Sequence, residues 1–522
     1  MSVNFLENDS TTQWLANNSG DTYVVKQGVY LGVLGNAISG TAAVLNRKFQ
    51  IDGYVIGEGG GSGMFIGADT TTGGSSTIRI SQTGSVMGEN YGILAQGGDL
   101  DFLNEGSVTG GSAGLYATGS GNHIVNRGTI SAFVAAGISA NGANANIFNE
   151  GTISGTTNGI EVDGTQSILV NSGLIITNSS VLTEAAVSLA GNYTSFLNLG
   201  TVSAVSTYAI LGDDLTQTVT NKGTITNAVN LGGGADYFYN RGGDMLGTVG
   251  LGAGSDFFNG IGGSDDVTVI GGADNDTYVI DSLDFTLIES ENGGLFDTVQ
   301  SYVDYRLQAN FEGLVLMGHA DLTGRGNSAG NIMTGNLGDN ELYGLAGDDS
   351  FYSDAGADRI DGGQGRDYLS YGNTYLSVKV NLMTGKGMGG EAEGDRYFSI
   401  EDLLGSARSD VLIGSNAANY LDGYYGKSDV LTGNGGKDVF NFRAGEPVNH
   451  VTITDFVART DKIDLHEMNN LYFIDTLAEV KALSHNDGDN LVIDFSSLQD
   501  HTTLTLLGVH KADLSAGDFI FV

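Results

Sequence analysis

The chain has 522 residues, of which 61 are acidic and 22 are basic, so its formal net charge at pH 7 is −39. A charge of this sign argues against nucleic acid or an anionic membrane surface as a partner and favours cations, which would offset the self-repulsion of the chain. There are 83 glycines, one proline and no cysteine. Disulfides and thiolate metal sites are therefore excluded, and many tight turns between β-ladders are expected.

Residues 1–50 are predicted to form an N-terminal cap. Their first 20 residues contain neither a basic nor an apolar signal region, so no cleavable signal peptide is predicted. The following VVKQGVYLGVLG is rich in β-branched residues and glycine, which predicts short strands. A cap is expected because the end of a solenoid exposes unpaired strand edges. No apolar run approaches the length of a membrane span, and none is predicted.

Residues 51–230 are predicted to be a β-helix, because an Asn-x-Gly marker recurs along them and on to residue 242, at intervals of 22, 23, 22, 27, 23 and 19 residues. The asparagines of the marker are Asn104, Asn126, Asn149, Asn171, Asn198, Asn221 and Asn240. A period of about 22 residues with strands and turns and no helical segment predicts one coil of a parallel β-helix. The asparagines are expected to stack as an amide ladder. The repeat resembles those of autotransporter β-helices, which implies an architecture and no catalytic residue.

Residues 231–281 are predicted to bind cations through a second kind of repeat. LGGGADYFYN and LGAGSDFFNG recur after 20 residues, and GIGGSDDVT and GGADNDTYV follow them. The sixth residues of these units are Asp236, Asp256, Asp265 and Asp276. Residues 282–325 alternate apolar and polar side chains and are predicted to be a β spacer.

Residues 326–370 divide without a gap into GNSAGNIMT, GNLGDNELY, GLAGDDSFY, SDAGADRID and GGQGRDYLS. Each unit is a glycine-rich turn followed by a very short strand, which cannot bury its apolar residue alone, so neighbouring units must stack. The sixth positions are Asn331, Asn340, Asp349, Asp358 and Asp367, and the eighth positions are Met333, Leu342, Phe351, Ile360 and Leu369. We assign residues 326–372 to this block and residues 373–404 to a second spacer.

These units resemble the haemolysin-type RTX nonapeptide, a calcium-binding repeat. The resemblance implies a parallel β-roll with two units per turn, in which the Asp of one unit shares a calcium ion with the Asp two units later. Asp349 and Asp367 are then a pair with two carboxylates, completed by carbonyl groups of Gly344, Gly347, Gly362 and Gly365. The same rule implies that Asp256 pairs with Asp276 and with Asp236. Asp358 faces Asn340 and Asp349 faces Asn331. An amide brings an oxygen but no charge, so these sites are expected to be weaker or empty.

Residues 405–441 form a third block of the same kind, with the units GSARSDVLI, GSNAANYLD, GYYGKSDVLT and GNGGKDVFN. Asp410, Asp429 and Asp438 are its predicted acidic ligands, with Asn419 at the remaining position. Residues 442–522 are predicted to be a C-terminal β cap. Its segments VTITDFVARTDKIDL and ADLSAGDFIFV resemble the C-terminal region of RTX proteins exported by type I secretion. The resemblance implies the type I secretion apparatus as a partner and an extracellular or cell-surface location.

Catalytic residues are not predicted. Glu161 and Asp163 share one strand face, but a solvated face explains them better than sugar chemistry. Parallel β-helices often carry polysaccharide lyases or epimerases, yet residues 51–230 offer only Arg79, Arg127 and Lys222 as strong bases, on different coils. His466-Glu467 lacks the second histidine of a zincin helix. The segment from His485 to Asp489 is expected to be a turn.

The sequence therefore predicts an all-β protein in which a parallel β-solenoid continues into calcium-binding parallel β-rolls. The predicted function is a secreted, non-enzymatic surface, adhesive or matrix scaffold that folds on binding extracellular calcium, with cell-surface or matrix polysaccharide as a further candidate partner. The alternative is a β-helix lyase or epimerase acting on polysaccharide and carrying an RTX secretion and folding module.

Overall fold

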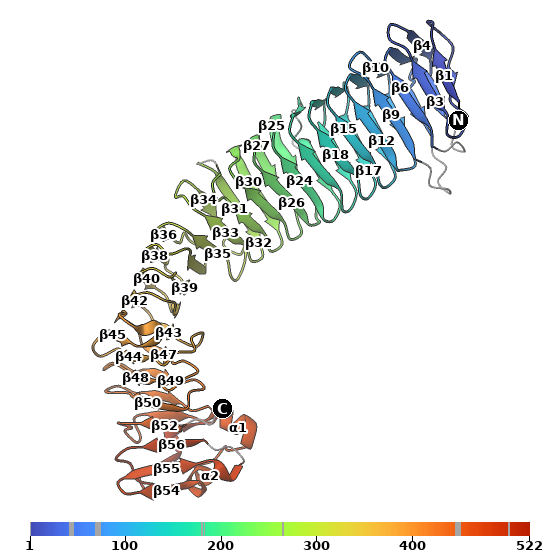
Figure 1. Ribbon diagram of the computed structural model, residues 1–522. Coiled ribbons are helices and arrows are strands. Elements are labelled where there is room, and N and C mark those ends of the chain that lie inside the picture. Colours follow the sequence, from blue (N-terminus) through green and yellow to red (C-terminus); the bar gives the residue numbers. More distant parts are fainter. Residues whose placement is uncertain are drawn as a thin grey trace. The chain divides into compact units, whose positions relative to one another are not determined.

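The computed structural model describes residues 2–40, 46–67, 75–178, 181, 183–263, 266–443, 450–498 and 502–521. Nearly all of the regular structure consists of short strands stacked in parallel ladders (Figure 1). The chain divides into two compact units, Met1–Leu295 and Phe296–Val522. The predicted all-β parallel solenoid is confirmed. Among the described residues, no helix has the length and apolarity needed to cross a membrane.

In the first unit, each coil adds one strand to a ladder in which neighbours pair in parallel and in register. This ladder consists of β1 (Val3–Leu6), β3 (Thr22–Val25), β6 (Lys48–Ile51), β9 (Ser76–Ile80), β12 (Leu100–Asn104), β15 (His123–Asn126), β18 (Asn146–Asn149), β21 (Ile168–Asn171), β24 (Thr194–Asn198), β26 (Gln217–Asn221), β28 (Tyr237–Asn240), β31 (Phe257–Asn259) and β33 (Thr277–Ile280). β1 pairs with β3 and β3 pairs with β6, so the segment predicted to be a cap consists of coils of the same ladder.

The other two sides of each coil in the first unit form a second sheet. Its strands are β2 (Trp14–Leu15), β4 (Tyr30–Leu34), β5 (Ile38–Gly40), β7 (Tyr54–Glu58), β8 (Met64–Ile66), β10 (Ser85–Gly88), β11 (Tyr91–Ala95), β13 (Ser107–Gly110), β14 (Ala113–Thr118), β16 (Thr129–Ala132), β17 (Ala136–Asn141), β19 (Thr152–Gly155), β20 (Ile160–Asp163), β22 (Leu174–Thr177), β23 (Ala185–Ala190), β25 (Thr201–Leu211), β27 (Thr224–Asn230), β29 (Asp244–Leu246), β30 (Thr248–Ala253), β32 (Thr268–Ala273) and β34 (Thr286–Ile288).

The core of the first unit follows from the alternation of side chains along each strand. One inward position repeats in register through successive coils, so that every member packs on its equivalents above and below. The row is Phe102, Ile124, Ile147, Leu169, Phe196, Val219, Phe238, Phe258 and Tyr278, all between 0 and 1% exposed. Burial of one such side chain stabilises by about 1.5–3 kcal/mol, and it is complete only where a coil has neighbours.

A row of buried asparagines runs beside this apolar row. The Nδ2 of each asparagine donates to the Oδ1 of the asparagine in the next coil, at 2.8–2.9 Å. The row contains the marker residues Asn104, Asn126, Asn149, Asn171, Asn198, Asn221 and Asn240, each 0 or 1% exposed. The predicted amide ladder is confirmed, and it satisfies polar groups that would otherwise be costly to bury.

The second unit has one ladder built from β35 (Thr298–Ser301), β37 (Gly313–Leu316), β39 (Ile332–Thr334), β41 (Ser350–Tyr352), β43 (Tyr368–Ser370), β47 (Asp402–Leu404), β49 (Tyr420–Asp422), β51 (Val439–Asn441), β53 (Lys462–Asp464) and β57 (Phe519–Ile520). A further sheet contains β36 (Tyr305–Arg306), β38 (Thr323–Arg325), β40 (Glu341–Ala346), β42 (Arg359–Gln364), β44 (Lys379–Asn381), β45 (Lys386–Met388), β46 (Arg396–Phe398), β48 (Val411–Ile413), β50 (Ser428–Thr432), β52 (His450–Ile453), β54 (Ser484–Asp487), β55 (Asn490–Asp494) and β56 (Thr503–Leu506). The eighth-position residues of the central block are 0–2% exposed, as their spacing predicts.

Two short helices depart from the prediction of a β cap for residues 442–522. They are α1 (His466–Tyr472) and α2 (Leu477–Ala482). α2 begins with a capping box, in which the Thr476 side chain accepts from the Glu479 N–H and the Glu479 side chain accepts from the Thr476 N–H. The helices bury Met468 and Val480 against the end of the solenoid fold. Thr-x-x-Glu before an apolar position was the available signal for α2.

Candidate metal centres

The sixth-position side chains of the nonapeptides lie beneath one another in buried rows. The backbone N–H of Asn331 donates to Asp349 Oδ1 at 2.7 Å, and the N–H of Asp349 donates to Asp367 Oδ1 at 2.9 Å. The other row of the central block joins the N–H of Asn340 to Asp358 Oδ1 at 2.7 Å. Each bond spans 18 residues, or two nonapeptides, so the structure places together the residues that the spacing pairs.

The same bond recurs in the other two blocks. In the third block it joins Asp410 to Asp429 at 2.9 Å despite the ten-residue unit between them. In the first block it joins Asp236 to Asp256 at 2.7 Å and Asp256 to Asp276 at 2.8 Å, each 20 residues apart. The third block also pairs the N–H of Asn419 with Asp438 Oδ1, at 2.9 Å. Asp265 lies outside the described residues.

Several of these carboxylates have one oxygen without a hydrogen-bond partner. The oxygen is Oδ2, it is buried, and the residues are Asp236, Asp256, Asp349, Asp367 and Asp429. At Asp349, a Cβ added to Gly344 would lie 2.1 Å from Oδ2 and 2.5 Å from the carbonyl oxygen of Gly362. Two acceptors therefore converge, with no donor between them, on a space that only glycine leaves free. Such a cradle of carboxylate and carbonyl oxygens fits a hard cation such as calcium.

Burial raises the pKa of each of these carboxyl groups above its usual value. The pKa is raised to about 8 for Asp236 and Asp429, to about 7 for Asp256 and Asp349, and to about 6 for Asp367. The N–H donated from the preceding coil lowers the pKa, and nearby acidic groups raise it further. Ionisation of these carboxyl groups is therefore less favourable in the protein alone than in water, and a bound cation would favour the ionised form.

The family model of the RTX calcium-binding nonapeptide repeat (4 copies) matches residues 334–369, 404–439 and 425–446. The chain contains RTX calcium-binding repeats. The matched segments include Asp349, Asp367 and Asp429, whose Oδ2 atoms lack partners. Calcium is the ion that RTX repeats bind, and the chain is a calcium-binding RTX-type protein.

Comparisons with whole proteins add little to this identification. No match was found among curated proteins. Among solved structures, the extracellular lipase LipA from Serratia marcescens shares 16% identity over 43% of this chain and 45% of that chain, with a TM-score of 0.19. The chain thus aligns with less than half the length of the lipase, and a TM-score this low carries no argument about fold.

The turns of the RTX blocks are of two kinds, which differ at the second position of the unit. In a closed turn, the backbone N–H of the second residue donates to the sixth-position side chain. The closed turns are Asn327 to Asn331, Asn336 to Asn340, Ser406 to Asp410 and Ser415 to Asn419, at 2.5–2.8 Å. In an open turn, the second residue has a positive φ. The open turns include Leu345 (81°), Gly363 (104°), Tyr424 (62°), Gly232 (96°) and Gly252 (123°).

Closed turns complete their polar side chains without an ion. Asn331 Nδ2 donates to the Phe311 carbonyl at 3.0 Å, and Asn419 Nδ2 donates to the Glu401 carbonyl at 2.8 Å. Asp410 also has a closed turn, and its carboxylate accepts from the Ser406 hydroxyl as well. The five carboxylates whose Oδ2 lacks a partner, Asp236, Asp256, Asp349, Asp367 and Asp429, all belong to open turns.

Acidic residues outside the nonapeptides continue the rows, and no motif in the sequence identifies them. Asp367 donates its N–H to Glu401 Oε2 at 2.9 Å, and Asp358 donates to Asp395 Oδ1 at 2.8 Å. Asp438 likewise donates to Asp461 Oδ1 at 3.0 Å. These partners lie 34, 37 and 23 residues away along the chain, because spacer loops intervene. Because these separations differ from the 18 residues of two nonapeptides, a search for acidic residues at a constant spacing does not find these partners.

Asp354, at the second position of its unit, is another acidic group that the nonapeptide pattern does not predict. Neither of its buried carboxylate oxygens has a hydrogen-bond partner. Burial, reinforced by the carboxylate of Asp358, raises the pKa of Asp354 well above its usual value. A Cβ on Gly335 would lie 2.6 Å from Asp354 Oδ2 and 2.4 Å from Asn340 Oδ1. The row of Asp358 and Asn340 therefore contains a further carboxylate, that of Asp354, beside the amide of Asn340.

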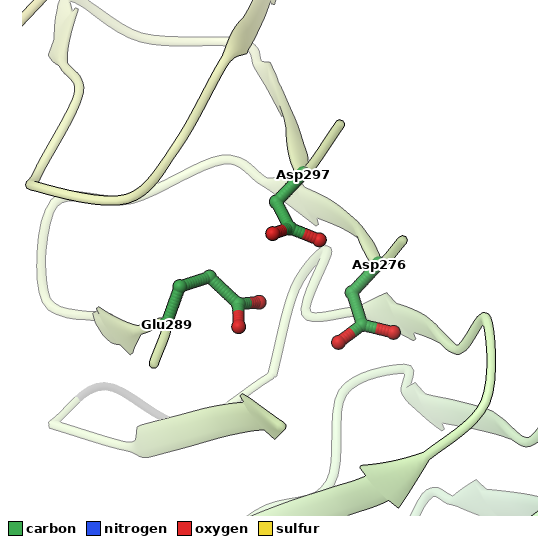
Figure 2. Close-up of side chains that lie close together, drawn as sticks. All are labelled: Asp276, Glu289 and Asp297. Atoms are coloured by element: carbon green, nitrogen blue, oxygen red, sulfur yellow. The ribbon is translucent and has the colours of Figure 1, made fainter. Parts of the chain in front are cut away.

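Asp276 and Glu289 close the acidic row of the first unit (Figure 2). A Cβ on Gly271 would lie 2.4 Å from Asp276 Oδ2 and 2.1 Å from Glu289 Oε1, so the two carboxylates converge. The hydroxyl of Tyr278 donates to Glu289 Oε1. Figure 2 also labels Asp297, which belongs to the second unit and donates its N–H to Glu312 there at 2.8 Å. Glu289 was not predicted, because it lies in the spacer.

The residues considered for catalysis are dispersed. Glu161 and Asp163 point outward from β20, as expected for a solvated face. Arg79 forms an ion pair with Asp101 at 2.5 Å, and Arg127 forms one with Glu150 at 3.1 Å. Two of the three strong bases of the β-helix thus form ion pairs with acidic residues of neighbouring coils. The predicted turn from His485 to Asp489 is shorter than expected: His485–Asp487 belong to β54, and only Gly488 and Asp489 form the turn to antiparallel β55.

Proposed function

We propose that this RTX-type protein is a secreted, non-enzymatic scaffold whose RTX blocks complete their folding when extracellular calcium fills the open turns. The observation that carries the proposal is the set of buried carboxylate oxygens without hydrogen-bond partners. A buried polar atom without a partner costs about 1–3 kcal/mol, and more if charged. Repetition of this cost along a row destabilises the calcium-free form and makes folding depend on the ion.

Asp349 and Asp367 form the strongest site in this account. Both have open turns, both Oδ2 atoms lack partners, and the carbonyls of Gly344, Gly347, Gly362 and Gly365 belong to the same turns. The first block supplies Asp236, Asp256 and Asp276, and the third supplies Asp429 and Asp438. Sites that use Asn331, Asn340 or Asp410 are weaker, because hydrogen bonds within the protein already occupy part of their oxygens. The site of Asp358 is weaker because its partner Asn340 brings no charge.

Secretion follows from the same chemistry. Extracellular modules commonly bind calcium with dissociation constants of about 10⁻⁴ to 10⁻³ M, so their sites are empty in the cytosol and filled outside the cell. An acidic chain with a net charge of −39 stays expanded by self-repulsion until cations bind. Passage through a type I secretion apparatus is proposed from the resemblance of the C-terminal segment. The β-helix would then serve as a surface, adhesive or matrix scaffold, with extracellular polysaccharide as its candidate partner.

The test is a calcium titration of the full chain followed by circular dichroism and thermal melting. We expect calcium to increase the β-sheet signal and the Tm, EDTA to reverse both, and the double substitution Asp349→Ala and Asp367→Ala to reduce the response. The control is Glu58→Ala with Asp163→Ala, which removes the same charge from exposed positions. The proposal is wrong if the signal and the Tm respond neither to calcium nor to the first pair of substitutions.

A further inference from the structure

Gln217 occupies, in the coil before Asp236, the place that an acid occupies in the RTX-type coils. It begins β26 and is fully buried. Its backbone N–H donates to Asp236 Oδ1 at 2.6 Å, just as the N–H of Asp236 donates to Asp256 Oδ1 at 2.7 Å. Gln217 therefore heads the row of Asp236, Asp256 and Asp276, although no motif in the sequence includes it.

The orientation of the Gln217 amide is fixed by its neighbours. Its Nε2 donates to Asp213 Oδ1, which also accepts the Leu215 N–H at 3.0 Å, while Asp213 Oδ2 accepts the Gly191 N–H at 2.9 Å. A flipped amide would turn its oxygen toward this carboxylate, so the arrangement with Nε2 toward Asp213 is favoured. Gln217 Oε1 is then buried without a hydrogen-bond partner.

Gln217 Oε1 faces the same kind of cradle as the RTX carboxylates. A Cβ on Gly212 would lie 2.5 Å from Oε1 and 2.1 Å from the carbonyl oxygen of Leu231. The corresponding values at Gly344 are 2.1 Å to Asp349 Oδ2 and 2.5 Å to the carbonyl of Gly362. In both places a side-chain oxygen and the carbonyl of the next coil meet at a glycine, with no donor between them.

We propose that Gln217 Oε1, the Leu231 carbonyl and the carboxylate of Asp236 bind a calcium ion one coil before the first acid of the RTX-type rows. Asp236 Oδ2 also lacks a partner, so it can contribute charge to an ion at this end of the row. Amide and carbonyl oxygens are ordinary calcium ligands. The inference rests on the proposed calcium function and extends it into the coil of Asn221, so that calcium would join the β-helix to the first RTX-type coil.

The experiment uses the full chain, with calcium counted by native mass spectrometry and located by hydrogen–deuterium exchange. Gln217→Leu keeps roughly the size of the side chain and removes its oxygen. Because the proposed ligand is lost, the variant should bind one calcium ion fewer, and residues 212–217 should lose their calcium-dependent protection. Gln217→Glu adds a charge and should keep the ion while lowering the calcium concentration for half-protection by on the order of tenfold. Thr194→Val is the matched control, since Thr194 lies opposite Gln217 in the preceding coil and its hydroxyl donates to the Gly191 carbonyl at 2.8 Å.

The outcomes separate this inference from the proposed function. One outcome is exchange protection that depends on calcium around Asp349 and Asp367 but not at residues 212–217. This result would overturn the Gln217 site and leave the proposed function intact. An unchanged calcium count in Gln217→Leu would do the same. If Gln217→Leu does not fold, Gln217→Glu decides, because an unchanged half-protection concentration would also reject the site. Loss of calcium dependence at Asp349 and Asp367 would instead reject the proposed function.

Discussion

The amide row of the β-helix and the carboxylate rows of the RTX blocks differ in how their buried polar side chains find hydrogen-bond partners. Both place a polar side chain of every coil in a buried row. In the amide row, Nδ2 of Asn126 donates to Asn149 Oδ1 at 2.8 Å, and the chain of bonds continues from coil to coil. In the carboxylate row, Asp349 Oδ1 accepts an N–H at 2.7 Å while Oδ2 has no partner. An amide brings a donor and an acceptor, and a carboxylate brings acceptors alone.

This difference assigns the calcium dependence to particular coils. From Asn104 to Asn221 every Nδ2 of the amide row has an acceptor in the next coil, so these coils should remain folded without calcium. The open turns lack a donor, so their coils should require a cation. The closed turn of Asp410 lies between these cases, because the Ser406 backbone and hydroxyl supply donors to its carboxylate.

The stability of the calcium-free protein should fall as pH rises. Burial raises the pKa of Asp236 and Asp429 from 3.8 to about 8 and that of Asp349 to about 7. At pH values between the usual pKa of 3.8 and the raised pKa of each group, the folded state holds more protons than the unfolded state. The free energy of unfolding therefore decreases as pH rises through this interval. Melting in EDTA should therefore give a Tm lower by roughly 10 °C at pH 8 than at pH 5. A Tm that rises over this interval in EDTA would contradict the assignment.

Asn149→Asp should strongly destabilise the β-helix. The substitution removes the Nδ2 donor to Asn171 Oδ1 and to the Leu174 carbonyl, and places a buried carboxylate in the row. The expected loss is about 3–5 kcal/mol in urea unfolding, and calcium should not restore it. Asn146→Asp on the same strand is the control, because that side chain lies on the outward face. Recovery of Asn149→Asp by calcium would show that a carboxylate alone creates a site.

Asp349→Asn should have opposite effects with and without calcium. In EDTA the variant should be more stable than the parent by about 1–3 kcal/mol, because an unpartnered buried carboxylate becomes a neutral amide. In millimolar calcium it should be less stable than the parent, since one charged ligand is lost. Urea unfolding in both conditions provides the comparison. Asp410→Asn is the matched control and should show a smaller reversal, because Asp410 has a closed turn.

Leu345→Gly should stabilise the central RTX block slightly. Leu345 has a φ of 81°, a conformation that is strained for a side chain with a Cβ and free for glycine. Relief of the strain should raise the free energy of unfolding by about 1 kcal/mol, as measured by urea denaturation in calcium. The converse variant, Gly363→Ala, places a Cβ at a φ of 104° and 2.4 Å from the Leu345 carbonyl, and should lower it. Equal stability of both variants and the parent would reject the strained open turn.

The regular part of this structure could be predicted from the sequence, because stacking converts a fixed spacing into a fixed neighbour. The Asn-x-Gly marker predicted the amide row, and the resemblance to the RTX nonapeptide, with two units per turn, predicted that Asp349 and Asp367 meet. The backbone conformation of each turn could not be predicted from the sequence. This conformation determines that the turn of Asp410 is closed and the turn of Asp349 is open. The spacer acids Glu401 and Asp395 were also hidden, because loops of unequal length bring them into the rows.

The most direct test of the account is regional hydrogen–deuterium exchange of the full chain in millimolar calcium and in EDTA. The account predicts that peptides of the amide row, from Asn104 to Asn198, keep their protection in both conditions. Peptides containing Asp349, Asp367 and Asp429 should lose protection in EDTA and regain it when calcium is restored. Equal protection of both regions in EDTA, or an equal loss in both, would contradict the division between amide and carboxylate rows.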